Sequence, residues 1–380
     1  MKWLQLVLFT FLLASCDNSV QRQKLVNQSD VTIDKHTYYK HYSGTIAGQP
    51  VVLHMSSNNG ALSGSYYYVK QGKLIGIYLA KDTTIANGYT VSEQAASRED
   101  ERDASWKIQL KDNAITGKWI SADGKQTYDI DLKEEYPAGS YRLAIWSKED
   151  SVRYRDDKPE PVATIYYKLL RAGSGMKNED AQMLEKLIMH ELGADSMNAI
   201  TVEDCVSKQI ENYAKWYKGI LDGEPDSMLG ESWNNYYSGV AMDVIINDND
   251  WLVMELSGSE YTGGAHGNYG VSYMNVDMQQ KRVWGIEDVM IVDSNKLNLL
   301  LEQEARRYFA MTAAEKIEER LLTDKILPNG NICITPRGIN FVYNPYEIAS
   351  YADGIIRLFI PFGQIKDLLK PEFMKRMGMN

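Results

Sequence analysis

The sequence predicts a multidomain chain: an all-β meander or small barrel, followed by an α+β region with helices packed on an antiparallel sheet. Residues 34–136 alternate apolar and polar side chains in short runs, and Asn-Gly, Gln-Gly and Asp-Gly turn signals separate these runs. Residues 139–380 combine similar runs with stretches that carry apolar side chains at helical spacing. A polar, proline-bearing joint near 136–139 separates the two patterns and marks the expected domain boundary.

The N-terminus, MKWLQLVLFTFLLASC, has the pattern of a lipoprotein signal peptide. Lys2 precedes the apolar run Trp3–Leu13, which is shorter than the roughly 20 residues that a bilayer span requires. Small residues then precede Cys16 and resemble a lipobox; an ordinary secretory signal with a chance cysteine is the alternative. We therefore expect residues 1–15 to be removed and Cys16 to carry a lipid that anchors the chain in the cell envelope, facing the periplasm or the outside. The polar segment 16–33 is expected to be a flexible tether.

Composition restricts the range of partners. The net charge is −10 and no basic block is present, which argues against nucleic acid because phosphate binding needs clustered Lys and Arg. Besides Cys16 the chain contains Cys205 and Cys333, which we interpret as two buried thiols rather than a disulfide. Neither has Cys or His at metal-ligand spacing, and no phosphate-binding glycine motif occurs. The sequence therefore predicts no metal and no cofactor.

The first block contains an internal echo. ALSGSY at 61–66 returns as AITGKW at 114–119, in both cases Ala-apolar-Ser/Thr-Gly-polar-aromatic. Two hairpin strands with the same inward and outward alternation would produce this repeat, which favours a meander or a small up-and-down barrel. The charged segment 96–105 is expected to be a solvent-exposed hairpin tip.

The second block begins with two strands, SYRLAIWS and ATIYYKLL, joined across DDKPEP. Two helices are expected next, the second beginning at Thr201 with Asp204 three residues later. A hairpin follows, SGVAMDVIIN with WLVMELSGSEY, and then VSYMNVDM, a helix through Leu297–Tyr308 and alternating C-terminal strands. Long helices on one face of an antiparallel sheet make an α+β arrangement.

Two stretches of this block carry a family resemblance. SEYTGGAHGNYGVSYMNVDMQQKRVWGIEDVM and ITPRGINFVYNPYEIASYADGIIRLFIPFGQIKDLL resemble the RsiV-type C-terminal domain, a domain of unknown function, and the resemblance covers about 139–371. Gly267 stands where members often carry proline. The best-understood relatives are membrane-bound anti-sigma factors whose extracellular part binds lysozyme, and others lie beside peptidoglycan deacetylase domains. We expect no anti-sigma role, because the sequence has no transmembrane helix. The resemblance implies a cell-envelope binding module, with a lysozyme-like protein or peptidoglycan as partner.

The loop YTGGAHGNYG is the first candidate site, and it contains no Lys, Arg, Asp or Glu. Its candidate binding residues are Tyr261, Thr262, Gly263, Gly264, His266 and Asn268. One interpretation is a structural corner, in which the glycines adopt positive φ and a buried, neutral His266 bonds to backbone groups. A ligand-contacting loop is the second, because loops on rigid sheets often carry binding residues. The third is catalysis by His266.

A second candidate patch combines Tyr346 and Glu347 of the NPYEI turn with Asp288. A hydrolase or deacetylase-like enzyme acting on wall glycan would use His266 with Glu347 or Asp288. However, the chain has no Gly-x-Ser-x-Gly motif, and no second histidine follows His190 at metalloprotease spacing. No catalytic residue is identified. We therefore predict a binding module for a cell-wall component or envelope protein, and keep the hydrolase as the alternative.

Overall fold

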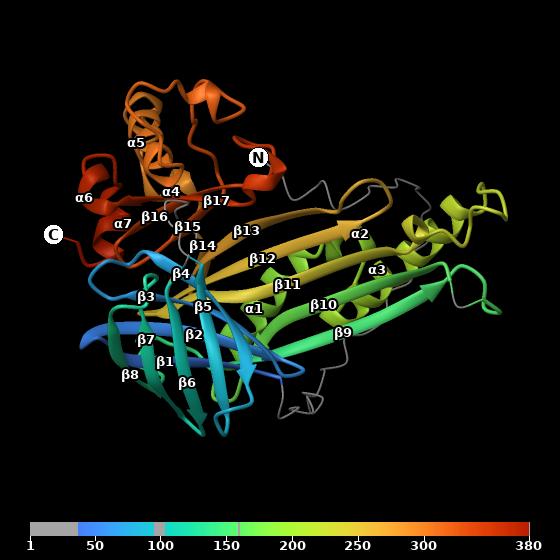
Figure 1. The fold of residues 1–380 in the computed structure, drawn as a ribbon, viewed down its shortest axis with the longest axis horizontal. Helices are drawn as coiled ribbons and strands as arrows, with labels where there is room; N and C mark the ends of the chain where they lie inside the picture. The colour runs from blue at the N-terminus through green and yellow to red at the C-terminus, as the bar shows by residue number, and fades with distance from the viewer. Residues whose placement is uncertain (1–36, 95–102, 159, 380) are drawn as a thin grey trace.

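The computed structural model describes residues 37–94, 103–158 and 160–379 (Figure 1). Within them the strands form a closed barrel, a six-stranded sheet and a three-stranded sheet. The predicted signal peptide, Cys16 and the tether 16–33 lie outside the described residues, as does most of the charged segment 96–105. In the part of the chain that the structure describes, no helix is both long enough and apolar enough to cross a membrane.

The predicted meander or barrel is confirmed as a closed eight-stranded antiparallel barrel. Each strand pairs with the next, and β1 pairs with β8 to close the ring. Apolar side chains, among them Trp106, Leu53 and Ile115, fill the interior. The strands are β1 (Tyr38–Ile46), β2 (Gln49–Asn58), β3 (Ala61–Tyr68), β4 (Leu74–Asp82), β5 (Gly88–Gln94), β6 (Ser105–Lys111), β7 (Ala114–Ile120) and β8 (Thr127–Glu134).

The sequence echo has a packing reason. It places Gly64 in β3 and Gly117 in β7. A Cβ atom on Gly64 would lie 2.2 Å from the His54 carbonyl oxygen, and one on Gly117 would lie 2.1 Å from the Lys107 carbonyl oxygen. At both positions the neighbouring strand passes too close for a side chain, as is typical where barrel strands bend.

The six-stranded sheet has the order β14-β13-β12-β11-β10-β9. Every neighbouring pair is antiparallel except β10 and β11, which are parallel. The predicted α+β arrangement of helices packed on a sheet is confirmed, and the sheet is antiparallel apart from this pair. The parallel pair was not predicted; it forms because the helical segment after β10 returns the chain as a crossover. The strands are β9 (Leu143–Arg153), β10 (Val162–Ala172), β11 (Tyr236–Asp248), β12 (Trp251–Tyr261), β13 (Asn268–Asp277) and β14 (Arg282–Val283).

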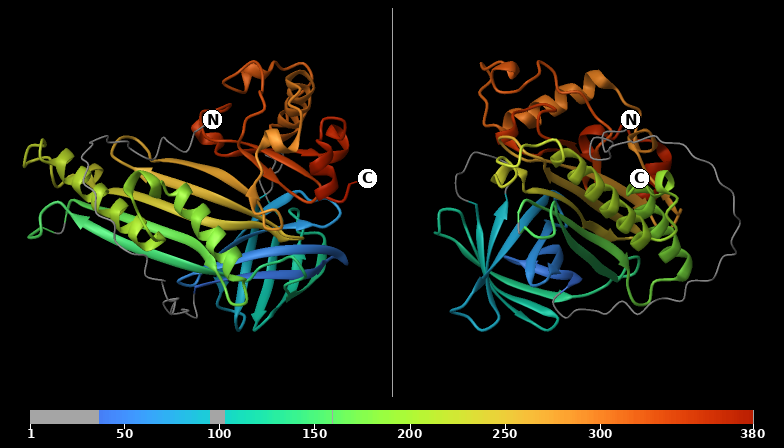
Figure 2. Two further views of the ribbon diagram at one scale, coloured as in Figure 1. Left: turned by 180° about the vertical axis from the view of Figure 1, so that it is seen from behind. Right: turned by 90° about the vertical axis from the view of Figure 1, so that its right-hand side faces the viewer.

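The crossover helices cover one face of this sheet (Figure 2). They are α1 (Asn178–Glu191), α2 (Ala194–Met197) and α3 (Val202–Leu221), with the short 3-10 helix η2 (Ser232–Asn234) before β11. The predicted helix start at Thr201 is confirmed, because its hydroxyl accepts a hydrogen bond of 3.1 Å from the Asp204 amide. Cys205 is buried in the core between α3 and the sheet.

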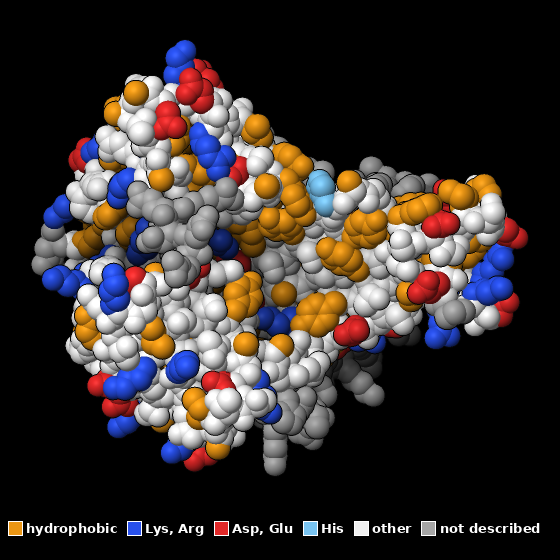
Figure 3. All heavy atoms as spheres, viewed as in Figure 1, with side chains coloured by type: hydrophobic (Ala, Val, Ile, Leu, Met, Phe, Trp, Pro, Cys, Tyr) orange, Lys and Arg blue, Asp and Glu red, His pale blue; other side chains and the backbone are white. Residues whose placement is uncertain are grey.

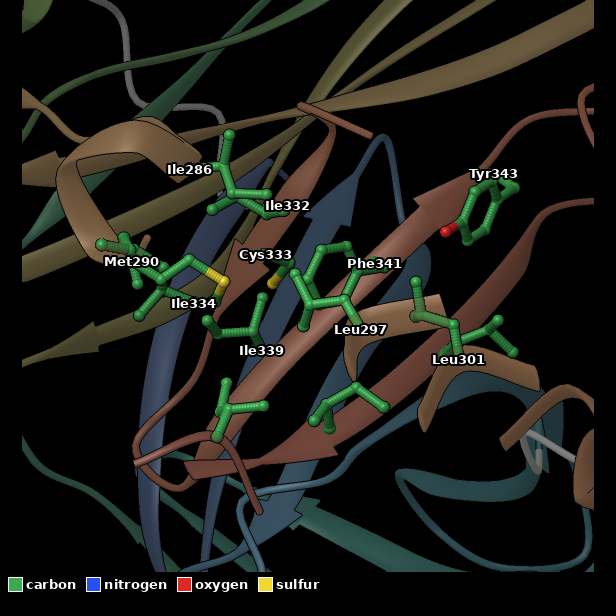
Figure 4. Packing of buried hydrophobic residues seen from close by; sticks show 14 of the residues in the cluster. Ile286, Met290, Leu297, Leu301, Ile332, Cys333, Ile334, Ile339, Phe341 and Tyr343 are labelled. Carbon is green, nitrogen blue, oxygen red and sulfur yellow. The ribbon is translucent and has the colours of Figure 1, made fainter. Parts of the chain in front are cut away.

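The remaining chain forms a lobe on the other face of the sheet, near the barrel. The lobe contains the three-stranded sheet, and Figure 4 shows Ile286, Leu297 and Leu301 packed over it. Cys333 is buried here as a free thiol in a different core from Cys205, so the prediction of two buried thiols is confirmed. The elements are α4 (Ile286–Val289), α5 (Ser294–Tyr308), η3 (Ile317–Glu319), β15 (Ile332–Ile334), β16 (Gly338–Tyr343), η4 (Tyr351–Asp353), β17 (Ile356–Pro361), α6 (Phe362–Ile365) and α7 (Pro371–Arg376).

The barrel packs directly against the second region. Tyr39 of β1 joins the core under the helices, and Tyr67 of β3 joins the core of the lobe. The Asn247 side chain donates a 3.1 Å hydrogen bond to the Tyr39 hydroxyl across this contact. The two sequence blocks are therefore distinct in architecture but share buried side chains.

Candidate functional site

The loop between β12 and β13 is a corner that glycine makes possible. Gly263 and Gly264 have φ angles of 91° and 95°, a region that side chains rarely adopt. A Cβ atom on Gly267 would lie 2.6 Å from the Glu260 carbonyl oxygen and 2.8 Å from the Tyr237 hydroxyl. A side chain at position 267 would therefore collide first with the backbone of Glu260 and then with the Tyr237 hydroxyl, which gives a physical reason for glycine at this position.

The expectation of a buried His266 is wrong, because its side chain is exposed at the tip of this loop. The imidazole stacks on the Tyr351 ring at a centroid distance of 4.0 Å. Its Nδ1 lies 2.9 Å from the Gly267 carbonyl oxygen, and its Nε2 lies 3.4 Å from the Tyr346 hydroxyl. An aromatic neighbour and the backbone thus fix the ring without burial in the core.

Exposed aromatic rings surround His266, and we call this group the tyrosine platform. Tyr346, Tyr237 and Tyr269 are 56%, 43% and 37% exposed, unusual values for large aromatic side chains. Figure 3 shows hydrophobic side chains, tyrosine included, gathered around a histidine on this face. The platform consists of Tyr237, Tyr261, His266, Tyr269, Tyr346 and Tyr351.

The platform rings support one another. Tyr351 lies at their centre, with ring centroids 5.3 Å from Tyr269 and 5.9 Å from Tyr346. Its hydroxyl donates a 2.7 Å hydrogen bond to the Gly267 carbonyl oxygen. Tyr237 and Tyr261 stack in parallel at 6.3 Å. The rings are therefore ordered before any ligand arrives.

Tyr346 has a strained backbone. Its φ is 69°, which is uncommon for a bulky residue and costs on the order of 1 kcal/mol or more. Its amide donates a 3.0 Å hydrogen bond to the Ala349 carbonyl oxygen and closes the turn. The turn holds this ring outward, beside His266, so the structure brings Tyr346 and the first candidate loop together.

Glu347 and Asp288 lie apart from this group of contacts. The Glu347 carboxylate accepts hydrogen bonds from the Asn344 amide at 3.1 Å and the Asn329 side chain at 3.4 Å, which closes its own turn. Burial raises the pKa of Glu347. Asp288 caps α4 through the Gly285 amide and pairs with Arg282, which lies opposite Asp277 at the far end of β13. The predicted second patch therefore does not form as one unit.

A charged row, which was not predicted from the sequence, crosses the same sheet face closer to the barrel. Asp243 and Glu255 are direct cross-strand partners on β11 and β12, and each has its own cation. Lys168 Nζ lies 2.6 Å from Asp243 Oδ1, and an Arg357 guanidinium nitrogen lies 2.8 Å from Glu255 Oε2. We use the name charged row for Lys168, Asp243, Glu255, Tyr273 and Arg357. The sequence did contain a signal for this row, because Asp243 and Glu255 are acidic residues within otherwise apolar strands.

The floor between the platform and the row is made of small residues. Strand register puts Gly239 beside Ser259, and Ala241 beside Ser257, on the face opposite the helix-side core. All four are half-buried, and Tyr166 of β10 borders them. In Figure 3 this face is hollowed between the barrel and the lobe.

The site offers stacking and hydrogen bonding. The ring nitrogens of His266 face a backbone carbonyl and a phenol, while Asp243 and Glu255 are each held against a cation. Among the described residues, no three His, Cys, Asp or Glu side chains are grouped so that they could hold a metal ion.

Fold and site define a multidomain, mostly β protein whose second region exposes an ordered aromatic surface. Residues 287–363, from α4 to α6, form a DUF3298 domain, as they match the family model described as "Protein of unknown function (DUF3298)". No curated protein matches the chain. The RsiV-type assignment remains a prediction.

Two solved structures of this family resemble the chain. A DUF3298 family member from Bacteroides fragilis has 24% identity and a TM-score of 0.56, covering 63% of this chain and 98% of its own. A DUF3298 family protein from Pseudomonas aeruginosa has 16% identity and a TM-score of 0.44, covering 61% and 96%. The first of these shows a shared fold.

Proposed function

We propose that this protein is a lipid-anchored binding module of the cell envelope and that the tyrosine platform is its ligand-binding surface. One observation carries the proposal: a cluster of exposed rings is held in place by stacking, by hydrogen bonds and by the strained turn at Tyr346. Backbone strain is retained where the surrounding structure imposes it, and such positions concentrate at functional sites.

Energetic reasoning supports binding by these rings. A tyrosine presents a large apolar face together with a polar hydroxyl and has few rotatable bonds, so its ordering costs little entropy. Rings that are already stacked lose still less freedom when a ligand covers them, and this preorganisation increases affinity. Three platform residues lie at the ends of β11, β12 and β13, and the others lie in the adjoining loop, in the turn at Tyr346 and in η4. Loops and turns supported by a rigid sheet in this way are the usual place for binding residues.

The location rests on the N-terminal sequence. The lipobox-like run before Cys16 supports an anchor in the envelope membrane, and incorporation of a labelled fatty acid at Cys16 tests it. A cell-wall component or an envelope protein such as a lysozyme-like protein is then the partner within reach.

Exchange of one platform ring tests the proposal. The mature chain is mixed with purified peptidoglycan and, separately, with immobilised lysozyme, and retention is measured for the parent and for Tyr346→Ala. We expect the variant to lose retention by about tenfold or more, since an exposed, ordered tyrosine in an interface is a typical hot spot. Tyr78→Ala is the matched control, because Tyr78 on barrel strand β4 is 57% exposed and Tyr346 is 56% exposed.

Two outcomes would contradict the proposal. Equal retention of parent and Tyr346→Ala would show that the platform is not the binding surface. Release of soluble sugar or acetate from the peptidoglycan would instead favour the hydrolase or deacetylase-like alternative, which would use His266 with Glu347 or Asp288.

A further inference from the structure

We propose that the open face of the sheet between the tyrosine platform and the charged row is a trough for a linear, uncharged polysaccharide strand. This inference rests on the proposed function, because the platform is one end of the trough. On β11 the trough runs from Tyr237 to Asp243, roughly 20 Å at the usual rise per strand residue. That length accommodates several sugar rings in a row.

The floor is suited to a flat ring. Gly239, Ala241, Ser257 and Ser259 have no side chain larger than a hydroxymethyl group, so a ligand can approach the sheet closely. A Cβ atom on Gly239 would lie 3.1 Å from the Ser259 hydroxyl and 3.9 Å from the Tyr166 ring, so even a methyl group would crowd this floor. Small hydroxyl side chains can exchange hydrogen bonds with the hydroxyl groups of a sugar.

The walls and ends supply stacking without net charge. Tyr166 borders the floor and is held by a hydrogen bond from the Asn58 side chain of the barrel. At one end the platform presents rings that can pack on the apolar faces of sugars. At the other end Lys168 and Arg357 are each paired with a carboxylate. An anionic polymer would have to displace one of these carboxylates, whereas a neutral chain leaves both pairs intact.

The position of the trough also disfavours an extended peptide. A peptide that joins a sheet needs a free strand edge, where its backbone can form ladder hydrogen bonds. Of the strands beneath the trough, β10, β11 and β12 each have a strand neighbour on both sides. β13 pairs with β14 only at Val276 and Asp277, and nearer the platform the side chains of Asn331 and Asn344 in the lobe occupy the backbone groups of Val271 on its outer edge. The occupant must therefore bind through the side chains of the face, as stacked sugars do.

Two measurements test the inference: how binding depends on the length of the oligosaccharide, and how it responds to substitutions that fill the floor of the trough. Binding of chitohexaose, cellohexaose and mannohexaose to the mature chain is measured by calorimetry, together with the disaccharide of any hexaose that binds. We expect at least one hexaose to bind, and more tightly than its disaccharide. Gly239→Leu should weaken hexaose binding by about tenfold or more because leucine fills the floor. Ser259→Leu fills it from the neighbouring strand and serves if Gly239→Leu does not fold.

A matched control lies behind the sheet. Gly219 is an exposed residue of α3 with open space around its Cα, so Gly219→Leu should bind the hexaose like the parent. The inference is overturned if no hexaose binds, or if both floor variants fold and bind like the parent. The trough proposal can fail while the proposed function holds: if Tyr346→Ala loses retention on immobilised lysozyme while no hexaose binds, the platform binds a protein and the trough proposal alone is wrong.

Discussion

The two faces of the six-stranded sheet carry very different side chains. On the helix side, alternate residues such as Leu169, Met254 and Val276 are fully buried under α1 and α3. On the other side the intervening residues are tyrosines, small residues and paired charges. Since successive side chains of a strand point to opposite faces, the same strands can maintain a dry core on one side and a chemically varied surface on the other.

The lobe and the barrel cover only part of the second face. Trp251 and Val253 at the start of β12 are buried in the core of the lobe, while Ser257, Ser259 and Tyr261 further along the same strand stay partly exposed. Residues that stabilise the core and residues that are free to contact a ligand are therefore separated along β12 as well as between the two faces of the sheet.

The largest expected effect is on the free energy of unfolding, and it should differ between two residues on opposite faces of β10. Leu169→Ala should lower the free energy of unfolding by about 3 kcal/mol, because it leaves a cavity in the core under the helices. Tyr166→Ala, on the opposite face, should cost roughly 1 kcal/mol, mainly from the lost hydrogen bond with Asn58. Urea denaturation of both variants measures the difference, and equal losses would contradict the contrast between the faces.

The next effect concerns acidification at the contact between the barrel and the sheet. His41 and His54 are buried there with ring centroids 5.1 Å apart. Burial lowers the pKa of His41, although the Glu135 backbone, Asp248 and the Glu135 carboxylate act against it. Burial, and then the charge of His41, lowers the pKa of His54 well below its ordinary value.

Both folded-state pKa values lie below that of an unfolded histidine, so the unfolded chain binds more protons in acid. The stabilisation by the two neutral rings is complete above about pH 6.5 and is lost as the pH falls below it, by about 1.4 kcal/mol for each unit of pKa lowering. Unfolding free energies at pH 7.5 and 5.5 measure this loss, which should shrink in His41→Leu. An unchanged pH dependence in that variant would show that groups other than these two histidines are responsible.

The smallest effects lie in the loop of the platform. Gly264→Val should cost on the order of 1 kcal/mol, since the φ of 95° strains a side chain even though no atom lies within 4 Å of its Cβ. His266→Gln should change stability by less than about 0.5 kcal/mol because the imidazole is exposed. Thermal unfolding ranks the two variants. A His266→Gln protein that is less stable than Gly264→Val would show that the stack on Tyr351 contributes more than the corner.

Local patterns predicted much of this architecture, and the gaps have physical causes. Alternation and turn residues indicated the barrel strands, and helical spacing placed the buried residues of α1 and α3, because these signals depend on near neighbours in sequence. Alternation carries no information about strand direction, so the parallel pairing of β10 with β11 was not foreseen. The glycines at 263 and 264 indicated a corner, but exposure of His266 depends on Tyr351, which is distant in sequence.

The candidate site shows the same limit. Tyr346 and His266 were both selected from the sequence, yet their contact requires the lobe to fold back beside the loop between β12 and β13. The charged row draws residues from β10, β11, β12, β13 and β17, and no short motif contains more than one of its members. Such a constellation becomes visible when strand order and register are known.

The parallel contact between β10 and β11 also has a consequence for how the chain folds. The β9–β10 hairpin and the β11–β12–β13 meander can each form from adjacent segments, but they can join only after residues 173–235 have closed a long loop between them. Contacts of such sequence separation form slowly. Until they form, β10 and β11 each present an unpaired edge beside an apolar face, the kind of surface to which a second copy can add. The time during which these unpaired edges favour aggregation is therefore set by how fast the crossover segment, with its helices, brings β10 and β11 together, and not by how fast the strands themselves form.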